Sequence, residues 1–391
     1  MGIPGDLLVV GVSIAFIYLA AYFLSKRKLS GDFEIDIQGG ALLLKTTRLN
    51  KFIEDFGKKH TKLLKRLGNL GALASIIMAG YGIYFFHENL LLLRTAPTAA
   101  SPVSPILPGI TIGLEALPYF LLAVAITLIS HELAHAFHAA SENVKVKSTG
   151  IFLFLVLLGG FAEIDEEELA KRPLSTQLRV FAAGSFANIL TFLLLLLVFT
   201  LIFASPLAPR PVGVLVTETI QRYPAYDKLA SGDIIIAIDN SPTPTTSIFS
   251  ETLSHYKPND TVQLTVLRNG KKISITLQLA SHPQNSSRGF MGVMINQVYT
   301  NEWMYKASWW LLVVTSSVAI INVMPILPLD GGRMLKAVLE KTLPRNIAKG
   351  LSLGLSMYLT VILIANIAYS TARWPILTPW REYWPASRGV G

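Results

Sequence analysis

The residues best suited to chemistry lie in ITLISHELAHAFHAA, residues 126–140, where a long apolar stretch ends. His131 and His135 are four residues apart, so a helix would place both imidazoles on one face, one turn apart. Glu132 lies beside them. Zinc held by the spacing His-Glu-x-x-His activates water and polarises a carbonyl, while the glutamate passes a proton to the departing amine. The pattern therefore predicts metal-assisted hydrolysis of a peptide bond, with Glu132 as the base.

These residues also have a plainer explanation, because histidine and glutamate cost little at a helix end near a membrane surface. Against it, three ionisable groups lie just inside an apolar segment, and such groups are usually functional. His138 follows at the next turn. We interpret His138 as a supporting or structural residue rather than a ligand.

Two histidines leave a zinc site one protein ligand short. The chain has no cysteine, so that ligand must be a histidine or a carboxylate. We expect Asp330, in INVMPILPLDGGRM, residues 321–334, at the inner end of a later apolar segment. Pro325 and Pro328 should interrupt the helix there and carry the carboxylate into the bundle. The alternative is that Asp330 only caps the helix that follows it.

These residues must be positioned by a chain that is predominantly apolar. The 391 residues are 51% hydrophobic and 15% charged, with a mean hydropathy of +0.48, unlike an average soluble protein. The composition predicts an α-helical polytopic membrane protein. The first apolar segment lacks a basic start and a cleavage site, so we interpret it as an anchor. Segments of spanning length occur at residues 7–24, 68–86, 113–135, 177–204, 305–327 and 350–370.

The chain has a net charge of +9, and its basic residues are distributed unevenly among the loops. Lysines and arginines crowd the segment between the first two spans, whereas the next loop has only Arg94. Basic loops stay in the cytoplasm, so odd spans should run inward and even spans outward. This topology places the histidines and Asp330 toward the cytoplasmic side of the cell membrane. Because the charges follow loop parity, we expect no nucleic-acid partner.

Residues 210–298 have a different character, with many turn formers and short alternating apolar runs. Strands are predicted at GVLVTETI, DIIIAID, TVQLTVLRNG and KKISITLQLA, the last two joined by a hairpin at Asn269-Gly270. The string YPAYDKLASGDIIIAIDNSPT resembles a PDZ domain core, in which a short helix leads into a turn, here Gly232-Asp233. Such domains bind extended peptides along a sheet edge. The alternative is an unrelated small β-rich domain that serves as a spacer.

Two further stretches are neither spans nor ordinary loops. Residues 33–46 contain an alternating arm and a Gly-Gly turn, which predicts a hairpin near the inner surface. Residues 148–165 are apolar but too short to cross, and Gly159-Gly160 interrupts them. We expect a re-entrant or surface-lying β segment, covered by protein or facing a watery cavity.

Three motifs resemble the site-2 protease family of intramembrane zinc metalloproteases. They are His131-Glu132-Leu133-Ala134-His135, Asn322-x-x-Pro325-x4-Asp330-Gly331, and Gly184-Ser185-Phe186-Ala187-Asn188, which fits the family's Gly-x-x-x-Asn. The PDZ-like insertion fits the family too, and the resemblance covers about residues 113–335. The second proline of the aspartate motif, Pro328, falls one residue later than in many bacterial members.

The resemblance implies one zinc ion per chain, bound by His131, His135 and Asp330, with Glu132 as base. It makes Asn188 and Asn322 candidates for steadying the substrate or the oxyanion. From the residues alone, Asn188 is only a buried amide that needs a partner in a closely packed helix.

The resemblance also implies the partners, which are single-span membrane proteins cut within or near the lipid bilayer. The substrate helix must unwind, because its carbonyls are hydrogen-bonded. We expect the extended segment to pair with an edge strand within residues 150–164. The PDZ-like domain would bind extended peptide ends or act as a gate.

The resulting organisation has five parts. They are a peripheral membrane region with two spans and a basic loop (1–112), the first part of the catalytic core (113–209), the extracytoplasmic PDZ-like domain (210–298), the second part of the core (299–335), and a last span with a tail (336–391).

Three alternatives remain open from the sequence. A different membrane protease with the same histidine motif would take its third ligand from the acidic stretch formed by Glu163, Glu166, Glu167 and Glu168. A non-catalytic PDZ-containing scaffold would leave Glu132 and the paired histidines without a purpose. A zinc transporter would need more intramembrane carboxylates than Glu115 provides.

Overall fold

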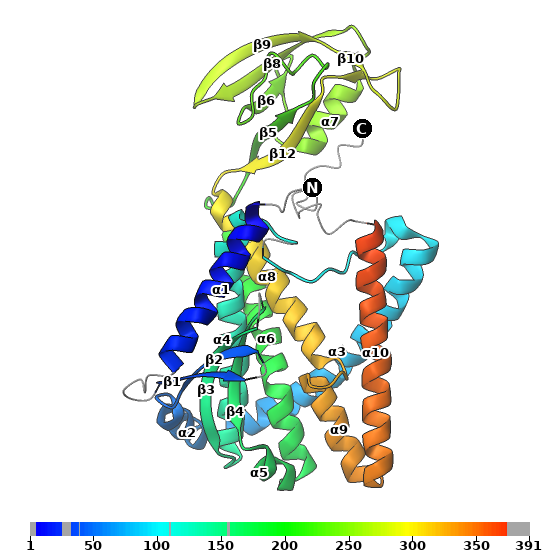
Figure 1. The fold of residues 1–391 in the computed structure, drawn as a ribbon. Helices are drawn as coiled ribbons and strands as arrows, with labels where there is room; N and C mark the ends of the chain where they lie inside the picture. The colour runs from blue at the N-terminus through cyan, green and yellow to red at the C-terminus, as the bar shows by residue number, and fades with distance from the viewer. Residues whose placement is uncertain (1–4, 26–32, 39, 109–110, 155–156, 374–391) are drawn as a thin grey trace. The chain divides into compact units, whose positions relative to one another are not determined.

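The computed structural model describes residues 5–25, 33–38, 40–108, 111–154 and 157–373. The described residues form two compact units (Figure 1). The first unit contains those up to Val198 and those from Ala307 onward. The second unit runs from Phe199 to Lys306.

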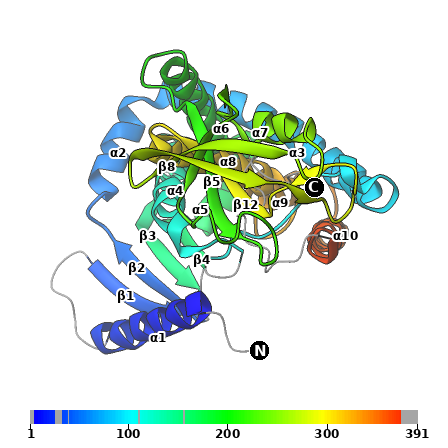
Figure 2. The ribbon, with the colours of Figure 1, turned by 90° about the horizontal axis from the view of Figure 1, so that it is seen from above.

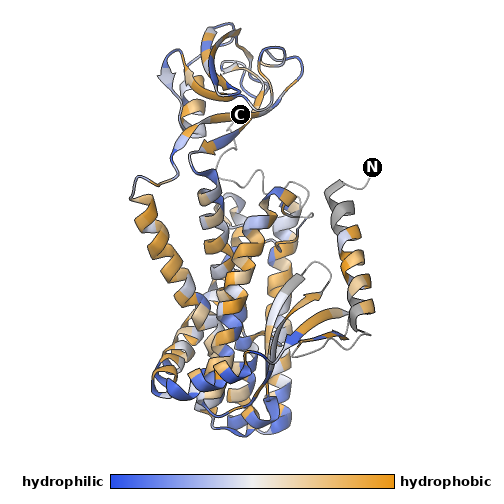
Figure 3. Ribbon diagram, turned by 90° about the vertical axis from the view of Figure 1, so that its left-hand side faces the viewer, coloured by the Kyte–Doolittle hydropathy of each residue, from blue (hydrophilic) through white to orange (hydrophobic). Residues whose placement is uncertain are grey.

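The first unit is mainly helical. Among the described residues, five helices are long and apolar enough to cross a membrane, and their orange apolar residues are visible in Figure 3. The prediction of a polytopic helical protein is therefore confirmed. In the first predicted span, α1, the apolar stretch with described side chains is shorter, Gly11–Ala20. The helices are α1 (Gly5–Ser25), α2 (Asn50–Lys59), α3 (Thr61–Thr95), α4 (Leu117–Ser141), α5 (Glu166–Lys171), α6 (Leu174–Phe203), α8 (Glu302–Val323), α9 (Asp330–Thr342) and α10 (Arg345–Arg373).

A four-stranded antiparallel sheet accompanies these helices, in the order β1 (Phe33–Gln38), β2 (Ala41–Thr46), β3 (Val146–Phe154), β4 (Leu157–Ile164). The predicted hairpin and the predicted β segment thus join in one sheet, seen in Figure 2. Tyr18 of α1 reaches it, with its hydroxyl 2.8 Å from the carbonyl oxygen of Leu153. Of the described strands, β4 pairs only with β3, so β4 forms one edge of the sheet.

Helix α4 packs closely because small residues line its C-terminal half. Ala136 and Ala139 are fully buried, together with Ile53 of α2. Gly57 of α2 has no room for a side chain, since a Cβ there would lie 2.6 Å from the Ala140 Cβ. Strand β4 also contacts α4. Tight packing between α2 and the sheet fixes the position of this half of α4.

The chain unwinds between α8 and α9, as the two prolines predict. Helix α8 ends at Val323, and α9 begins at Asp330. A Cβ on Gly331 would lie 1.9 Å from the Val323 carbonyl oxygen, so only glycine lets the start of α9 pass this close to the end of α8. Leu327 N–H in the connection donates to Ser356 Oγ of α10 at 2.8 Å. The last span therefore braces the loop that carries Asp330, which the sequence did not predict.

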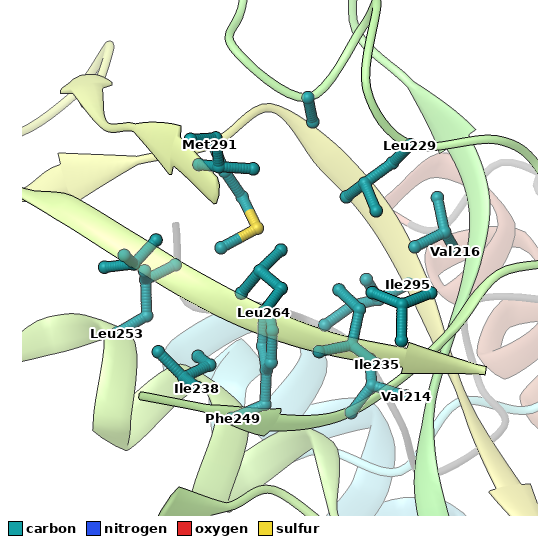
Figure 4. Close-up of a cluster of buried hydrophobic side chains, with 14 of the residues drawn as sticks. Val214, Val216, Leu229, Ile235, Ile238, Phe249, Leu253, Leu264, Met291 and Ile295 are labelled. Atoms are coloured by element: carbon teal, nitrogen blue, oxygen red, sulfur yellow. The ribbon is translucent and has the colours of Figure 1, made fainter. Parts of the chain in front are cut away.

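The second unit is the small β-rich domain that the sequence predicts. Its main sheet has the order β12-β5-β6-β8-β9, with β7 paired to β6. Figure 4 shows its buried core, which includes Val214, Ile235, Phe249, Leu264 and Met291. The elements are β5 (Pro211–Thr219), β6 (Ile234–Ile238), β7 (Ser241–Pro242), α7 (Thr246–Ser254), β8 (Thr261–Arg268), β9 (Lys271–Gln278), β10 (Ala280–Ser281), β11 (Gly289–Phe290) and β12 (Val293–Tyr299).

All four predicted strands of this domain are confirmed, and so is the hairpin. Asn269 and Gly270 have φ of 51° and 76°, as a tight two-residue turn requires. The segment before Gly232 differs from the expected short helix. Successive turns occupy it instead, because several of its backbone bonds span three residues, such as Tyr226 N–H to Tyr223 O. Helix α7 was not predicted.

Candidate active site

The two histidines of the His-Glu-x-x-His motif meet Asp330 inside the first unit. His131 and His135 lie one turn apart on α4, with their Nε2 atoms 3.1 Å apart. Asp330 Oδ2, at the first turn of α9, is 3.3 Å from each of these nitrogens. Only 6% of His131 and 8% of His135 is exposed. Residues far apart in the sequence thus place three ligand atoms within 4.8 Å of one another.

The spacing of these atoms fits a zinc ion. In a tetrahedral site with zinc bonds of about 2.0–2.1 Å, neighbouring ligand atoms are about 3.3 Å apart. The three observed separations are 3.1, 3.3 and 3.3 Å. Three protein ligands leave the fourth position for water or substrate, as in catalytic sites. The cluster is therefore a candidate metal site consistent with zinc.

Asp330 does not act as a helix cap. The N-cap of α9 is Leu329, and no side chain caps this helix. The Asp330 carboxylate instead accepts a hydrogen bond from Ser185 Oγ of α6 at 3.0 Å, through the oxygen nearest the histidines. The alternative interpretation of Asp330 is therefore wrong.

Glu132 lies beside the cluster with its carboxylate unengaged. The side chain is half-buried and forms no hydrogen bond or ion pair with the part of the chain that the structure describes. Its Cγ packs on β4, where a Cβ on Gly160 would lie only 2.9 Å away. A half-buried carboxylate without a partner is suited to proton transfer.

Helix α6 supplies polar groups that contact the candidate metal ligands. The carbonyl oxygen of Val180 lies 2.7 Å from His135 Nδ1. Asn188 Nδ2 lies 3.0 Å from His131 Nδ1. A Cβ on Gly184 would lie 2.3 Å from His135 Nε2 and 2.5 Å from His131 Nε2, so glycine keeps the space beside the cluster open. We call Val180, Gly184, Ser185 and Asn188 the α6 face.

The two asparagines that the sequence singled out lie in different surroundings. Asn188 is fully buried and bonded on both ends of its amide. Asn322, in the last turn of α8, is half-buried and forms no side-chain hydrogen bond with any described residue. The sequence motif predicts both positions. It gives no signal for Val180, which acts through its backbone carbonyl.

The other candidates lie elsewhere. His138 is buried outside the cluster, with its Nδ1 2.9 Å from the Ala134 carbonyl oxygen. Glu163 accepts from Ser148 Oγ, Glu166 pairs with Arg333, and Glu168 pairs with Arg172. The metal cluster found among the described residues includes no residue of this acidic stretch. His282 is also outside the cluster and is only 5% exposed, because it packs on Phe290.

Comparisons with known proteins agree with this geometry. A family model described as Peptidase family M50 matches residues 119–364. The chain is 28% identical over 319 residues to an uncharacterized protein of Methanocaldococcus jannaschii, an alignment that covers 77% of this chain and 79% of the relative. It is also 27% identical over 202 residues to the membrane-bound transcription factor site-2 protease homolog of Arabidopsis thaliana. That alignment covers 50% of this chain and only 39% of the plant protein.

Among solved structures, the chain is similar to small single domains. One is the PDZ domain of the SdrC-like protein of Listeria monocytogenes, at 24% identity and a TM-score of 0.20, covering 22% of this chain and 87% of that one. Another is a protein of Geobacillus thermodenitrificans, at 29% identity and a TM-score of 0.20, covering 21% of this chain and 94% of that one.

Proposed function

The chain belongs to peptidase family M50, and we propose that it is a zinc enzyme that hydrolyses peptide bonds within or near the transmembrane segments of membrane-anchored proteins. As a member of that family it is a multi-pass membrane metalloendopeptidase of the site-2 protease type. The observation that carries the proposal is the meeting of His131, His135 and Asp330 beside the unpaired Glu132.

The proposed roles follow from the donor set. His131, His135 and Asp330 would hold the metal. When bound, zinc polarises the scissile carbonyl and makes a water molecule more acidic. Glu132 would take a proton from the attacking water and pass it to the departing amine. We assign Asn322 as the donor to the substrate or its oxyanion, because the sequence motif makes it a candidate and its side chain forms no hydrogen bond with any described residue.

A substrate segment must be extended to present a peptide bond, and β4 offers it a partner. Along the edge of β4 that pairs with no described strand, backbone N–H and C=O groups can hydrogen-bond to those of an extended substrate segment in the membrane. Because Gly160 of β4 touches Glu132, a strand added at this edge would pass close to the proposed base. The expected edge strand is therefore β4 in particular, since β3 lies between β2 and β4.

A proline scan of β4 tests this step. Successive strand residues aim their N–H groups alternately at β3 and at the open edge. Phe161→Pro and Ala162→Pro should therefore differ. The variant that removes an N–H bonded to β3 should unfold part of the sheet, whereas the variant that removes an N–H at the open edge should keep the protein's stability and lose cleavage. Full cleavage by a variant whose N–H faces the open edge would contradict strand addition.

The orientation that we propose places the cluster toward the cytoplasm and the second unit outside the cell membrane. Basic residues in the last turns of α2 and α9 and at the start of α10 support it, including Lys58, Lys59, Lys341 and Arg345. Labelling of a cysteine introduced at Lys59 by a membrane-impermeant reagent in intact cells would contradict this orientation.

The second unit would bind extended peptide ends or restrict access by substrates with bulky outer domains. The two ends of this unit lie side by side, so it can be removed to test its role. Arg210 N–H donates to Thr300 Oγ1 at 2.9 Å, and Thr300 N–H donates to Arg210 O at 2.8 Å. Replacing residues 212–298 with a short Gly-Ser linker should therefore leave the neighbouring helices in place. Cleavage of untrimmed substrates by this variant would support a gate, and loss of all cleavage would support recruitment.

The metal assignment is tested by zinc content. Purified wild type should contain about one zinc per chain, and Asp330→Ala should lose most of it. The matched control is Glu163→Ala, which removes a carboxylate of the acidic stretch. Zinc retained by Asp330→Ala and lost by Glu163→Ala would overturn the ligand set.

A further inference from the structure

Asn188 is, with Ser185, one of the two fully buried polar side chains of the α6 face. Its amide contacts two residues of α4. Nδ2 lies 3.0 Å from His131 Nδ1, and Oδ1 lies 3.2 Å from Ser130 Oγ. Both ends of this amide contact α4, and the side chain has no exposed surface.

The hydrogen bonds of Ser130 determine which end of the amide faces His131. Ser130 Oγ lies 3.0 Å from the carbonyl oxygen of Thr127 and 3.2 Å from Asn188 Oδ1. A hydroxyl has one hydrogen and cannot donate to both oxygens. The amide oxygen and nitrogen exchange places when the side-chain amide is flipped by 180°. With the flip, Asn188 Nδ2 donates to Ser130 Oγ, and Ser130 donates to Thr127.

The flipped amide also places Oδ1 against His131 Nδ1. An oxygen there can only accept, so His131 must carry its hydrogen on Nδ1. A neutral imidazole with hydrogen on Nδ1 has its lone pair on Nε2, the atom that lies in the metal cluster.

The neighbouring ligand shows the same arrangement. His135 Nδ1 lies 2.7 Å from the carbonyl oxygen of Val180, which can only accept. His135 therefore also presents its Nε2 lone pair to the cluster. Val180 and Asn188 are both on α6, so one helix fixes both imidazoles, through its backbone in one case and a side chain in the other.

From these contacts, we infer that Asn188 is a positioning residue that fixes the tautomer and ring orientation of His131, and not a donor to the oxyanion. This assignment rests on the proposed zinc enzyme. It also explains the motif Gly-x-x-x-Asn, because Gly184 and Asn188 lie one turn apart. Gly184 keeps space beside the ligand nitrogens, and Asn188 makes one of those nitrogens a ligand.

The test compares zinc affinity with turnover in the full-length protein. Asn188→Leu has a similar volume but cannot accept a hydrogen bond, whereas Asn188→Asp can only accept. Zinc affinity would be measured in detergent by competition with a chromophoric chelator. Cleavage of a single-span substrate would be measured at saturating zinc. Asn366→Leu is the matched control, since Asn366 is also fully buried in a span and bonds to Asn89 instead.

We expect Asn188→Leu to bind zinc about 10- to 100-fold more weakly, and Asn188→Asp to bind within about threefold of wild type. Much of the Asn188→Leu turnover should return at saturating zinc. The Asn366→Leu control should keep wild-type zinc affinity.

Three results would overturn the assignment. The first is unchanged zinc affinity in Asn188→Leu with turnover lowered about 100- to 1,000-fold in both Asn188 variants, the pattern of an oxyanion donor. The second is weakened zinc affinity in Asn188→Asp, and the third is an equal loss in Asn366→Leu. Zinc-free wild type would overturn the proposed function together with this assignment, whereas the other results leave that function standing.

Discussion

The α6 face and the two proposed reactive groups, Glu132 and Asn322, differ in how their polar atoms are used. On the α6 face, the Val180 carbonyl, the Ser185 hydroxyl and the Asn188 amide each contact one candidate ligand. Glu132 and Asn322 are half-buried and form no hydrogen bond within the described chain. Unpaired polar groups are costly inside a protein, so their retention points to partners that arrive with the reaction. Helix α6 therefore holds the three candidate ligands in place, whereas Glu132 and Asn322 have no such partner among the described residues.

The largest effect should come from filling the space beside the cluster. In Gly184→Val, the new side chain would start 2.3 Å from His135 Nε2 and push the ligands apart. We expect loss of both zinc and detectable cleavage, because the ligand geometry cannot form. Zinc content per chain checks this. Gly80→Val is the control, since a Cβ at Gly80 meets nothing within 4 Å.

The next effect separates the two asparagines. Asn322→Leu should lower turnover about 100- to 1,000-fold, as the loss of an oxyanion donor does. Zinc affinity should stay at the wild-type value, unlike that of Asn188→Leu. Single-turnover kinetics and chelator competition on the same preparation check both expectations. A weakened zinc affinity in Asn322→Leu would erase the difference between the α6 face and the reactive groups.

A smaller effect is expected where β4 meets Glu132. In Gly160→Ala, the added Cβ would lie 2.9 Å from Glu132 Cγ, so the glutamate must shift. Small displacements of a catalytic group are costly, and we expect a fall of about 10- to 100-fold in kcat/KM. Zinc affinity should not change. Ala162→Gly, a nearby change in the same strand, is the control.

The smallest catalytic effect should come from the second unit. Burial alone would raise the pKa of Asp233, but hydrogen bonds from Arg268 and the Ala230 N–H outweigh it, so the pKa lies below its ordinary value. Because the pKa of Asp233 is lower in the folded protein than in the unfolded chain, where it is about 4, the ionised carboxylate stabilises the fold above that pH. This stability is lost as the pH falls through the pKa of the folded state.

Asp233→Asn should therefore destabilise the second unit by about 1–2 kcal/mol at pH 7, and the difference should shrink below about pH 4. Hydrogen exchange of β6 and β8 in the full-length protein measures this. Zinc content and cleavage of a substrate with a short outer segment should match wild type. Loss of zinc in Asp233→Asn would mean that the cluster is not set by the first unit alone.

Much of the fold could be predicted because membrane spans and strands have strong local patterns. Long apolar runs predict α3, α4, α6, α8 and α10, and Asn269-Gly270 predicts its hairpin. The bracing of Leu327 by Ser356 could not be predicted, because it joins residues through tertiary packing without any pattern. Nor could β3 be recognised as an inner strand, since edge and inner strands with apolar residues look alike in sequence.

The ligands themselves could be predicted because their chemistry restricts residue types. His131, His135 and Asp330 follow from motif spacing, and the structure brings them together. Their partners could not be predicted as easily. The Val180 contact uses a backbone carbonyl, which every residue has. The role of Asn188 depends on Ser130, and that pairing becomes visible only in three dimensions.

We propose above all that the cluster is a metal site at which Glu132 acts as the base. The most direct measurement compares wild type with Glu132→Gln, recording zinc per chain and cleavage of a single-span substrate in one detergent preparation. We expect about one zinc in both proteins and cleavage by the wild type alone, because glutamine fits the same space but cannot take a proton. Equal cleavage by both proteins, or a wild type without zinc, would contradict this proposal.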